Sequence, residues 1–461
     1  MRTPSPSAPR SATGPSGHLL SGVLPEVRRD VLGFLLETAR RHGDVARYRL
    51  GPLTSFLVSH PDGVRQVLQD NVANYTKDHL SYTTARWVVG NGLLTSQGTF
   101  WLRQRRLAQP AFHRQRIAAM AGQMVRATTF MLESWEPHAV RGEPLGMMAE
   151  MMRLTFRIVG EALFGTDLGP QAETVSRAFT ELSEQVTTRF RSFRVLPPVL
   201  PFGEDRAFRV ARRELDETVF RIISERRRKK GDTGDLLSML MLARDEETGA
   251  RMDDQQLRDE ILTMLVAGHE TTATTLGWIW ALLAKHPRVE ARLHEELDAV
   301  LGGRLPTVED VPRLTYTRMV VDEALRLYPP AYVFSRKVVR DDVVCGFHIP
   351  GGSSVDLSPW VTHRHPEIWE QPEEFLPERF EPERAAQRPR YAYFPFSGGP
   401  RQCIGNSFAL MEAQLIVATV AQRFRPRLAP DYTLVPEPLI TLRPGGGLPM
   451  HLERRSAAVS G

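Results

Sequence analysis

The sequence has 461 residues but only two cysteines, Cys345 and Cys403. Two cysteines exclude a disulfide framework and are typical of a protein kept in a reducing compartment. The sequence also lacks a run of about 18 apolar residues, the length that a membrane span requires. Its N-terminus has no apolar core like that of a secretory signal. We therefore expect a cytoplasmic protein without a membrane span, and we expect it to be a monomer.

Other functional motifs are missing as well. The sequence contains no phosphate-binding G-x-x-x-x-G-K motif and no internal repeat. His269 and Glu270 begin the H-E-x-x-H pattern of zinc proteases, but position 273 is Ala instead of His. The formal net charge is +5, and the clearest basic cluster, at 226–230, ends a helical pattern, where cations complement the helix dipole. We therefore expect no nucleic-acid partner.

Composition indicates a large globular protein. Apolar residues make up 42% of the sequence, enough for an extensive core. We expect one large domain at 19–453, mainly α with a small β region. The segment 1–18 is rich in Pro, Ser and Ala, which predicts disorder, and 454–461 is expected to be a flexible tail.

Apolar periodicity locates the elements. Helical patterns cover 22–43, 61–70, 115–136, 147–164, 171–190, 204–230 and 254–285, and strand-like patterns cover 46–59, 338–357 and 437–452. The pattern at 254–285 is the longest. The segment 71–98 is irregular and is predicted as a long loop, which in a compact domain is usually functional.

The stretch 396–405 surrounds Cys403 with residues that favour a tight loop. Gly398, Gly399 and Pro400 allow the backbone to turn sharply before the cysteine. An apolar stripe of helical spacing begins at Phe408, so Cys403 lies just before a helix, whose N-terminus favours a thiolate. Such a loop suits a sulfur that binds a metal or takes part in chemistry.

The residues alone leave four roles open for Cys403. The glycines and the nearby Arg401 argue against a buried structural thiol. Structural zinc needs about four ligands at short spacing, and His363 and His365 lie too far upstream for a compact motif. A nucleophilic cysteine needs a histidine partner, which the sequence does not exclude. Ligation of haem iron needs one axial thiolate.

A family resemblance favours the last role. Phe396, Gly399, Arg401, Cys403 and Gly405 match every fixed position of F-x-x-G-x-R-x-C-x-G. This stretch resembles the haem-binding signature of the cytochrome P-450 monooxygenases. The resemblance, which covers about residues 20–452, implies that Cys403 is the axial ligand of haem b and that the other four residues shape the cofactor loop. It also implies the cytochrome P-450 fold.

The middle of the longest helical pattern contains Ala267-Gly268-His269-Glu270-Thr271-Thr272. Glycine and paired threonines are poor helix formers, and a buried acid is costly unless it is used. The segment resembles the family's A/G-G-x-D/E-T groove, which accepts dioxygen. The resemblance implies that Thr271 hydrogen-bonds the dioxygen and that Glu270 relays protons from solvent. A polar kink packed in a helical bundle is the alternative.

Two further sets of residues match family motifs. Trp101 and Arg105 are one helical turn apart, form a good anion site, and match W-x-x-x-R. Arg336 follows a proline pair and a strand-like run. The resemblance implies that these three residues contact the haem propionates.

Glu323 and Arg326 match the family's E-x-x-R, and Arg379 matches its P-E-R-F. An isolated pair at i,i+3 would usually be a weak surface bridge. The resemblance instead implies a buried triad that braces the cysteine loop and has a structural role.

The activity implied is RH + O₂ + two electrons + two protons giving ROH + water. No flavin or nicotinamide domain follows Gly461, so electrons from NAD(P)H are expected through a ferredoxin or similar partner and its reductase. Arginines at 103–106 and 401 would favour an acidic partner. A haem-thiolate peroxygenase or isomerase, and a non-catalytic haem binding or sensor protein, are the alternatives.

The substrate is expected to be a lipophilic small molecule, such as a terpenoid, fatty acid or polyketide. The apolar, proline-rich connector at 195–202 corresponds to the family's lid over the substrate channel. The predicted pocket residues are apolar or aromatic: Val89, Leu93, Leu262, Val266, Ala267, Tyr332, Val333, Phe334 and Ile440.

Overall fold

The computed structural model describes residues 8–165, 181–182, 204–228, 231 and 234–455. The chain divides into two compact units. Unit 1 comprises Met1–Ser81, Ala331–Glu374 and Pro382–Cys403, and unit 2 comprises Tyr82–Pro330, Phe375–Glu381 and Ile404–Gly461. The helix predicted at 171–190 is described only at 181–182, and the connector at 195–202 lies outside the described residues.

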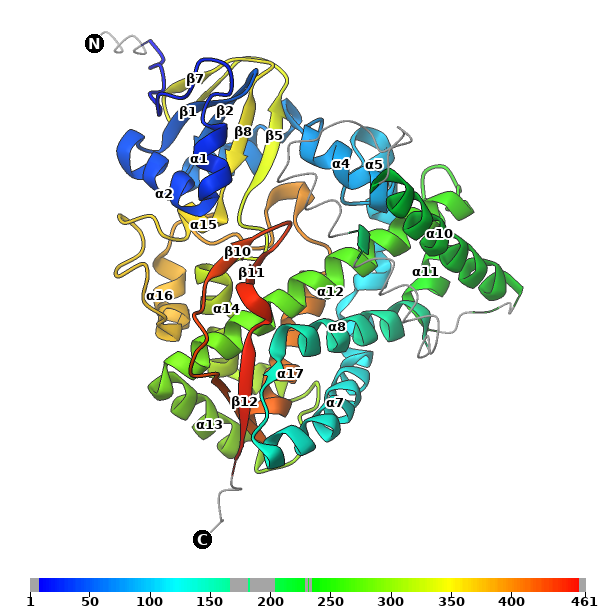
Figure 1. Ribbon diagram of the computed structural model, residues 1–461. Helices are drawn as coiled ribbons and strands as arrows, with labels where there is room; N and C mark the ends of the chain where they lie inside the picture. The colour runs from blue at the N-terminus through cyan, green and yellow to red at the C-terminus, as the bar shows by residue number, and fades with distance from the viewer. Residues whose placement is uncertain (1–7, 166–180, 183–203, 229–230, 232–233, 456–461) are drawn as a thin grey trace. The chain divides into compact units, whose positions relative to one another are not determined.

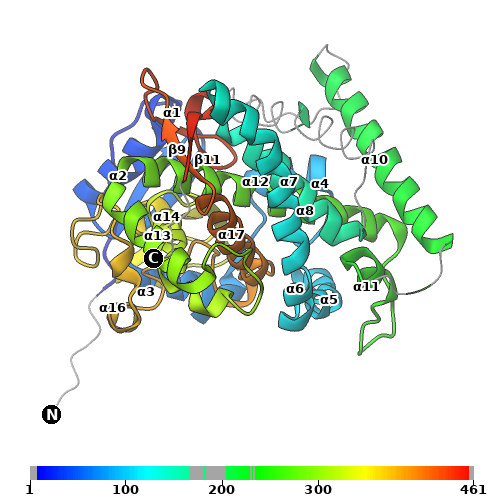
Figure 2. The ribbon, with the colours of Figure 1, turned by 90° about the horizontal axis from the view of Figure 1, so that it is seen from below.

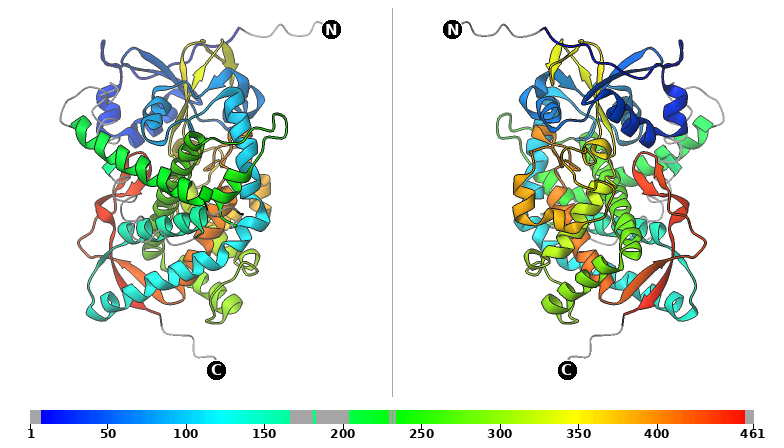
Figure 3. Two further views of the ribbon diagram at one scale, coloured as in Figure 1. Left: turned by 90° about the vertical axis from the view of Figure 1, so that its right-hand side faces the viewer. Right: turned by 90° about the vertical axis from the view of Figure 1, so that its left-hand side faces the viewer.

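Unit 1 is built on a five-stranded sheet of order β1-β2-β8-β5-β3. Its strands are β1 (Val45–Leu50), β2 (Leu53–Val58), β3 (Tyr75–Thr76), β5 (Phe334–Val338) and β8 (Ser354–Leu357), with a separate hairpin of β6 (Asp342–Val344) and β7 (Phe347–Ile349). Its helices are α1 (Leu24–Arg29), α2 (Val31–His42), α3 (Pro61–Arg65), α15 (Pro359–Thr362) and α16 (Pro382–Gln387). The pairs β1–β2, β8–β5 and β5–β3 are antiparallel, whereas β2–β8 is parallel. Strands far apart in the sequence, blue and yellow in Figure 3, thus form one sheet (Figures 1 and 3).

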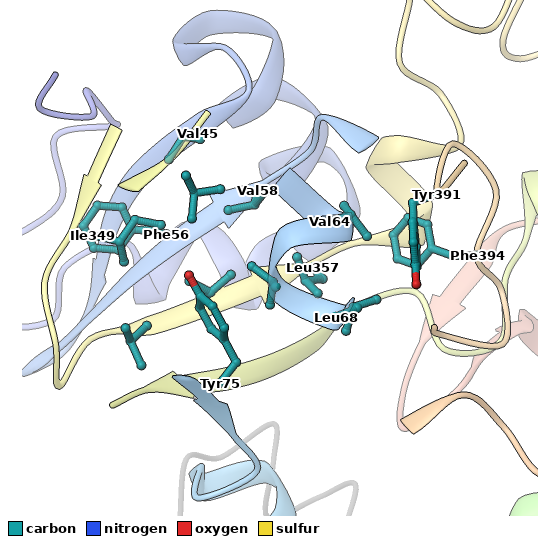
Figure 4. Packing of buried hydrophobic residues seen from close by; sticks show 14 residues of the cluster. Val45, Phe56, Val58, Val64, Leu68, Tyr75, Ile349, Leu357, Tyr391 and Phe394 are labelled. Carbon is teal, nitrogen blue, oxygen red and sulfur yellow. The ribbon is translucent and has the colours of Figure 1, made fainter. Parts of the chain in front are cut away.

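Buried side chains from this sheet and from the loops beside it form the core of unit 1 (Figure 4). Phe56 and Val58 alternate along β2, as expected for one face of a strand, and Leu357 of β8 joins them. Tyr391 and Phe394, from the segment that precedes the cysteine loop, belong to the same cluster. The loop that carries Cys403 is therefore attached to a rigid sheet.

The N-terminal segment is more ordered than its composition predicts. The Arg10 amide donates to the carbonyl of Gly346, and the Arg10 guanidinium lies 4.2 Å from the ring centroid of Phe347. The Arg47 amide donates to the carbonyl of Thr13 at 2.8 Å. Disorder across 1–18 is thus wrong from residue 8 onward, because backbone hydrogen bonds to strand edges, which composition does not report, hold the segment.

Unit 2 is mainly helical. Its helices are α4 (Leu80–Val89), α5 (Gly98–Ala108), α6 (Arg114–Ala119), α7 (Ala121–Arg141), α8 (Met147–Phe164), α10 (Glu204–Arg228), α11 (Leu236–Leu242), α12 (Asp254–Lys285), α13 (Pro287–Leu301), α14 (Thr315–Leu327) and α17 (Asn406–Ala421). Its strands are β4 (Leu145–Gly146), β9 (Phe424–Leu428), β10 (Pro436–Pro438), β11 (Leu442–Pro444) and β12 (Pro449–Arg454), in the sheets β4-β12-β9 and β10-β11. α12 packs against α8 and α17, and α7 packs against α8 (Figure 2).

The longest predicted helix is confirmed with its predicted bounds. A capping box of Asp253 and Gln256 begins α12, and Pro287 opens the next helix two residues after Lys285. The helix is continuous through Gly268, where a Cβ atom would lie 2.6 Å from Cγ2 of Val159 on α8. Gly268 is therefore required for close packing of α12 against α8, and the helix is unbroken at this position.

The segment predicted as a loop at 71–98 contains a helix, α4. Its buried side chains are Thr84, Val88 and Val89, too few and too polar to produce a clear apolar stripe. The helix ends at Gly90, which has a φ of +73°.

The segment 90–93, after α4, is fastened to α12 by two adjacent carboxylates. The Asn91 amide donates to Asp259 at 2.7 Å, and the Leu93 amide donates to Oε2 of Glu260 at 3.0 Å. A Cβ at Gly90 would lie 2.2 Å from the Asp259 carboxylate, so this approach requires glycine. Arg258 donates to Asp259 at 2.9 Å, which compensates one of the two buried acids.

Burial, with a smaller contribution from the neighbouring Asp259, raises the pKa of Glu260 to about 8 from its ordinary value of 4.5. Between these two pH values the unfolded chain has lost the proton that the folded protein keeps. We therefore predict that stability falls as the pH rises through this range, by up to about 1.4 kcal/mol per pH unit from this group. Urea unfolding from pH 5 to 9 should show Glu260→Gln gaining stability relative to the wild type up to about pH 8. Parallel stability curves would contradict this assignment.

Candidate functional site

The cysteine loop closes on itself before α17. The Cys403 amide donates to the carbonyl of Phe396 at 3.0 Å, and a short 3₁₀ turn, Gly399–Arg401, lies between them. Cys403 is exposed in the chain itself, three residues before α17 begins at Asn406. The structure thus confirms a tight loop just before a helix, and Cys403 is exposed in this loop.

The two glycines of the loop serve packing. A Cβ at Gly399, which has a φ of +62°, would lie 1.9 Å from the carbonyl oxygen of Leu68, and one at Gly398 would lie 2.1 Å from the Tyr391 ring. The Gly399 amide donates to the Tyr391 hydroxyl, which in turn donates to Gln69 at 2.9 Å. These contacts hold the loop on the core of unit 1, so the direction of the Cys403 side chain is set by packing.

Unit 1 also gathers three basic residues. Arg336, on strand β5 between β8 and β3, is buried and stacks on the Phe334 ring, with 5.1 Å between Cζ and the ring centroid. Lys77 is also buried, and its pKa lies well below the ordinary value because of burial and the charges of Arg336 and Arg401. Buried like charges are costly unless an anion joins them. This donor set fits the carboxylates of a haem, and sequence reasoning missed Lys77 because no periodic pattern marks it within 71–98.

Trp101 and Arg105 lie on α5, and both are half-buried. Arg105 Nε donates to the Gln109 side chain at 3.1 Å, which orients the guanidinium along the helix. The neighbouring Arg106 pairs with Asp245 at 2.8 Å and also with Glu247. The charge of Arg106 is thus compensated within unit 2, which the sequence did not predict.

The middle of α12 has one face that is not buried. Ala267 is exposed, and Val266, Gly268 and Thr271 are half-buried, whereas residues 272–283 are all buried. The Thr271 hydroxyl donates to the carbonyl of Ala267 at 2.5 Å. This i−4 bond keeps the hydroxyl on the open face of the helix, where it can also interact with a ligand.

Glu270 directly precedes Thr271 on α12. It is buried and accepts a hydrogen bond from the Thr441 hydroxyl at 2.8 Å. Burial raises its pKa, and the Thr441 bond and the charge of Arg443 partly offset this rise. A carboxyl group with a raised pKa holds and releases a proton more easily near neutral pH than an exposed one.

The predicted pocket residues fall in both units. In unit 2, Val89, Leu93 and Leu262 are buried, and Ile440 is 44% exposed. Trp278 of α12 donates to the carbonyl of Leu442 at 2.7 Å, which holds the segment after Ile440 against the helix. In unit 1, Tyr332, Val333 and Phe334 are half-buried at the start of β5. The structure brings the first group to α12 and the second to the sheet, and their role in binding stays a prediction.

The triad predicted from E-x-x-R and P-E-R-F is assembled within unit 2. Glu323 and Arg326 are fully buried on α14, with Arg326 Nε and Nη2 at 2.7 and 2.8 Å from the carboxylate. Arg379 lies 3.3 Å from the same carboxylate, and the Leu376 amide donates to it at 3.0 Å. The four contacts satisfy Glu323 and fasten the segment at 375–381 to α14. That this triad acts as a brace for the cysteine loop stays a prediction.

Comparison with known proteins identifies the family. The model of the family described as "Cytochrome P450" matches residues 13–446, which span both units. The chain belongs to the cytochrome P450 family. The chain is 28% identical to the structure titled "Crystal structure of cytochrome P450DA heme domain", with a TM-score of 0.88, covering 98% of this chain and 99% of that one. This match confirms the expected fold class, mainly α with a small β region in one large domain.

Three curated relatives of this P450 come from Streptomyces. "Cyclooctatin synthase" of Streptomyces melanosporofaciens is 40% identical over 438 residues, 95% of this chain and 94% of that protein. "Cyclooctat-9-en-7-ol 5-monooxygenase" of the same species is 40% identical over 92% of this chain and 91% of its own. "Pentalenene oxygenase" of Streptomyces avermitilis is 35% identical over 94% of this chain and 95% of that protein.

Membership makes this P450 a haem-dependent oxidoreductase that uses dioxygen, works with redox partners and acts on lipophilic molecules. Among the residues that the structure describes, no group of three or more His, Cys, Asp or Glu side chains could hold a metal ion, which leaves no multi-ligand zinc site there. Within the same residues, no helix is long and apolar enough to span a membrane.

The buried triad leads to a prediction for the stability of the P450. Removing the carboxylate in Glu323→Ala leaves the Arg326 guanidinium buried without its partner, which should cost about 3–5 kcal/mol and lower the haem content. The matched control is Glu37→Ala, which removes an exposed i,i+4 pair with Arg41 and should cost about 0.3–0.5 kcal/mol. Urea unfolding together with the ratio of haem absorbance to protein absorbance checks both. Equal losses in the two variants would contradict the brace.

Proposed function

We propose that this P450 inserts one oxygen atom from O₂ into a terpenoid. The observation that carries the proposal is 40% identity, over 92% of the chain, with a protein named cyclooctat-9-en-7-ol 5-monooxygenase, joined to a complete cysteine motif. The pentalenene oxygenase supports the same substrate class. The apolar character of the predicted pocket residues agrees with a hydrocarbon skeleton.

Cys403 would hold the haem iron as its axial thiolate, in the loop shaped by Phe396, Gly399, Arg401 and Gly405. The propionates would be bound by basic and indole side chains: Lys77, Arg336, Arg401, Trp101 and Arg105. When bound, the haem supplies the redox chemistry that activates dioxygen, and thiolate ligation favours O–O cleavage. The protein supplies binding, orientation and proton delivery.

Proton delivery would use Glu270 and Thr271. The buried carboxyl of Glu270, with its raised pKa, can hold a proton where water has little access. The Thr271 hydroxyl, already donating to the Ala267 carbonyl, can accept a hydrogen bond from one side and rotate to donate on the other. This pair favours oxygen activation over peroxygenase or isomerase chemistry, which needs no proton relay of this kind.

Electrons would come from NAD(P)H through a ferredoxin or similar protein and its reductase. An acidic partner would be attracted by accessible arginines. Arg401 is half-buried in the cysteine loop, and Arg103 of α5 is half-buried and stacks on Phe100. Arg106 is excluded from this role by its pairing with Asp245 and Glu247.

The proton-relay assignment is tested with Thr271→Val. Turnover driven by NADPH with a surrogate ferredoxin and reductase should continue to consume NADPH, but the product formed per NADPH should fall at least about tenfold, because the hydroxyl that guides the proton is lost. The control is Thr275→Val: this hydroxyl also donates to an i−4 carbonyl, that of Thr271 at 2.9 Å, but its side chain is buried.

Coupling in the control should match the wild type. If Thr271→Val retained wild-type coupling, Thr271 would have no part in proton delivery. Consumption of NADPH without any oxygenated terpenoid in the wild type would instead contradict the substrate class.

The partner surface is tested by charge reversal. Arg103→Glu should slow reduction by a ferredoxin several-fold at low salt and weaken the dependence of the rate on ionic strength, because exposed charges steer association. Arg41→Glu on α2, where Arg41 is already paired with Glu37, is the control. Stopped-flow reduction between 20 mM and 500 mM salt is the measurement. An unchanged salt dependence in Arg103→Glu would remove α5 from the docking surface.

A further inference from the structure

The N-terminal half of α12 contains two polar side-chain atoms that the proposed mechanism does not use. Oε1 of Glu260 and Oγ1 of Thr263 are buried, and neither has a hydrogen-bond partner among the residues that the structure describes. Glu260 is 1% exposed and Thr263 is 5% exposed. Buried polar groups are nearly always hydrogen-bonded, so two such atoms one helical turn apart point to a ligand group that joins them.

These two residues share a face of α12 with the proposed reaction centre. At 100° per residue, positions 260, 263, 267 and 271 fall on one stripe, because their spacings are three, four and four residues. Ala267 is exposed and Thr271 is half-buried on that stripe. At a rise of about 1.5 Å per residue, Thr263 lies about 6 Å along the helix axis from Ala267, and Glu260 lies about 16 Å along it from Thr271.

The segment 90–93 packs against both side chains and forms a hydrogen bond with only one carboxyl oxygen of Glu260. Leu93 donates its amide to Oε2 of Glu260 at 3.0 Å, so the carboxyl is held in place while Oε1 has no partner among the described residues. A Cβ at Gly92 would lie 2.3 Å from Oγ1 of Thr263, so glycine is required where the backbone passes over the threonine.

We propose that Glu260 and Thr263 bind a hydroxyl group of the substrate, so that this P450 acts on a terpenoid alcohol that is already oxygenated at a carbon remote from the one it oxidises. The inference rests on the proposed function, which supplies the terpenoid class, and adds the hydroxyl group and its position. A hydroxyl is both donor and acceptor, and it can bond the carboxyl and the threonine at once.

The chemistry of the pair favours a neutral hydroxyl over a charged group. The raised pKa of Glu260, about 8, keeps the carboxyl protonated at neutral pH, so it offers a donor as well as an acceptor. An ammonium group would require the ionised acid, and a carboxylate would meet the neighbouring Asp259. A site whose buried polar atoms pair with a substrate hydroxyl rejects the analogue that lacks it, because those atoms are then left unpaired.

The test compares cyclooctat-9-en-7-ol with the same hydrocarbon lacking the hydroxyl group. Binding is measured on the holoenzyme by the shift in haem absorbance that follows displacement of the iron-bound water. The wild type should bind the alcohol at least about tenfold more tightly than the hydrocarbon. Thr263→Val and Glu260→Leu should bring this ratio of affinities close to one, mainly by weakening the binding of the alcohol.

Thr128→Val is the matched control, because Thr128 is buried on α7 and its hydroxyl donates to the carbonyl of Met124 at 2.8 Å. It should lose stability but keep the wild-type ratio. Thr263→Val should keep the wild-type stability, since its hydroxyl has no partner among the described residues, so a change in its ratio reports ligand binding and not folding.

Equal affinity of the wild type for the two probes, or an unchanged ratio in both Thr263→Val and Glu260→Leu, would overturn the inference and leave the terpenoid function standing. No absorbance shift with either probe would instead overturn the substrate class, and the inference with it. A product oxidised at a carbon remote from the hydroxyl, together with loss of that regiochemistry in Thr263→Val, would support it.

Discussion

Burial of α12 imposes a constraint on much of unit 2, because each polar group on a buried helix needs a partner. Asp259 and Glu260 receive amides from the segment after α4, Glu270 receives the hydroxyl of Thr441, and Trp278 donates to the carbonyl of Leu442. Each of these bonds joins α12 to a segment more than 150 residues away in the chain. The polar groups of one helix thus position the segments expected to surround a substrate.

The cysteine loop differs from α12, since its central residue, Cys403, is exposed. Glycines at 398 and 399 allow the loop to pack tightly on Tyr391 and Leu68, and this packing directs the chain so that Cys403 is exposed. As the proposed haem ligand, Cys403 is positioned by the packing of its backbone on unit 1. Packing elsewhere in unit 1, through Phe394 and β5, supplies that rigidity and also places Arg336 near Lys77 and Arg401.

Residues that carry a local motif could be predicted from the sequence, whereas residues defined by their surroundings could not. The bounds of α12 follow from its caps and from Pro287, and the Glu323–Arg326 pair follows from helical spacing. Lys77 and Glu260 have no such signal: a lysine or a glutamate in a polar sequence is normally solvated, and only the chain packed over it makes it buried. The short helix α4 was missed for a similar reason, because its buried face becomes apparent only against the rest of unit 2.

The sequence by itself determined the family, the cysteine proposed as the thiolate ligand and the positions of the acid and threonine on α12. These depend on short-range order, since turns, caps and helical periodicity are set by neighbouring residues. The tertiary structure decided which charges are neutralised, as for Arg106, and which are buried together, as for Lys77. It also decided which polar atoms have no partner within the described part of the chain, as for Glu260 and Thr263. The physical reason is that solvation and electrostatic energies depend on every group within a few ångströms, and most of those groups come from distant parts of the chain.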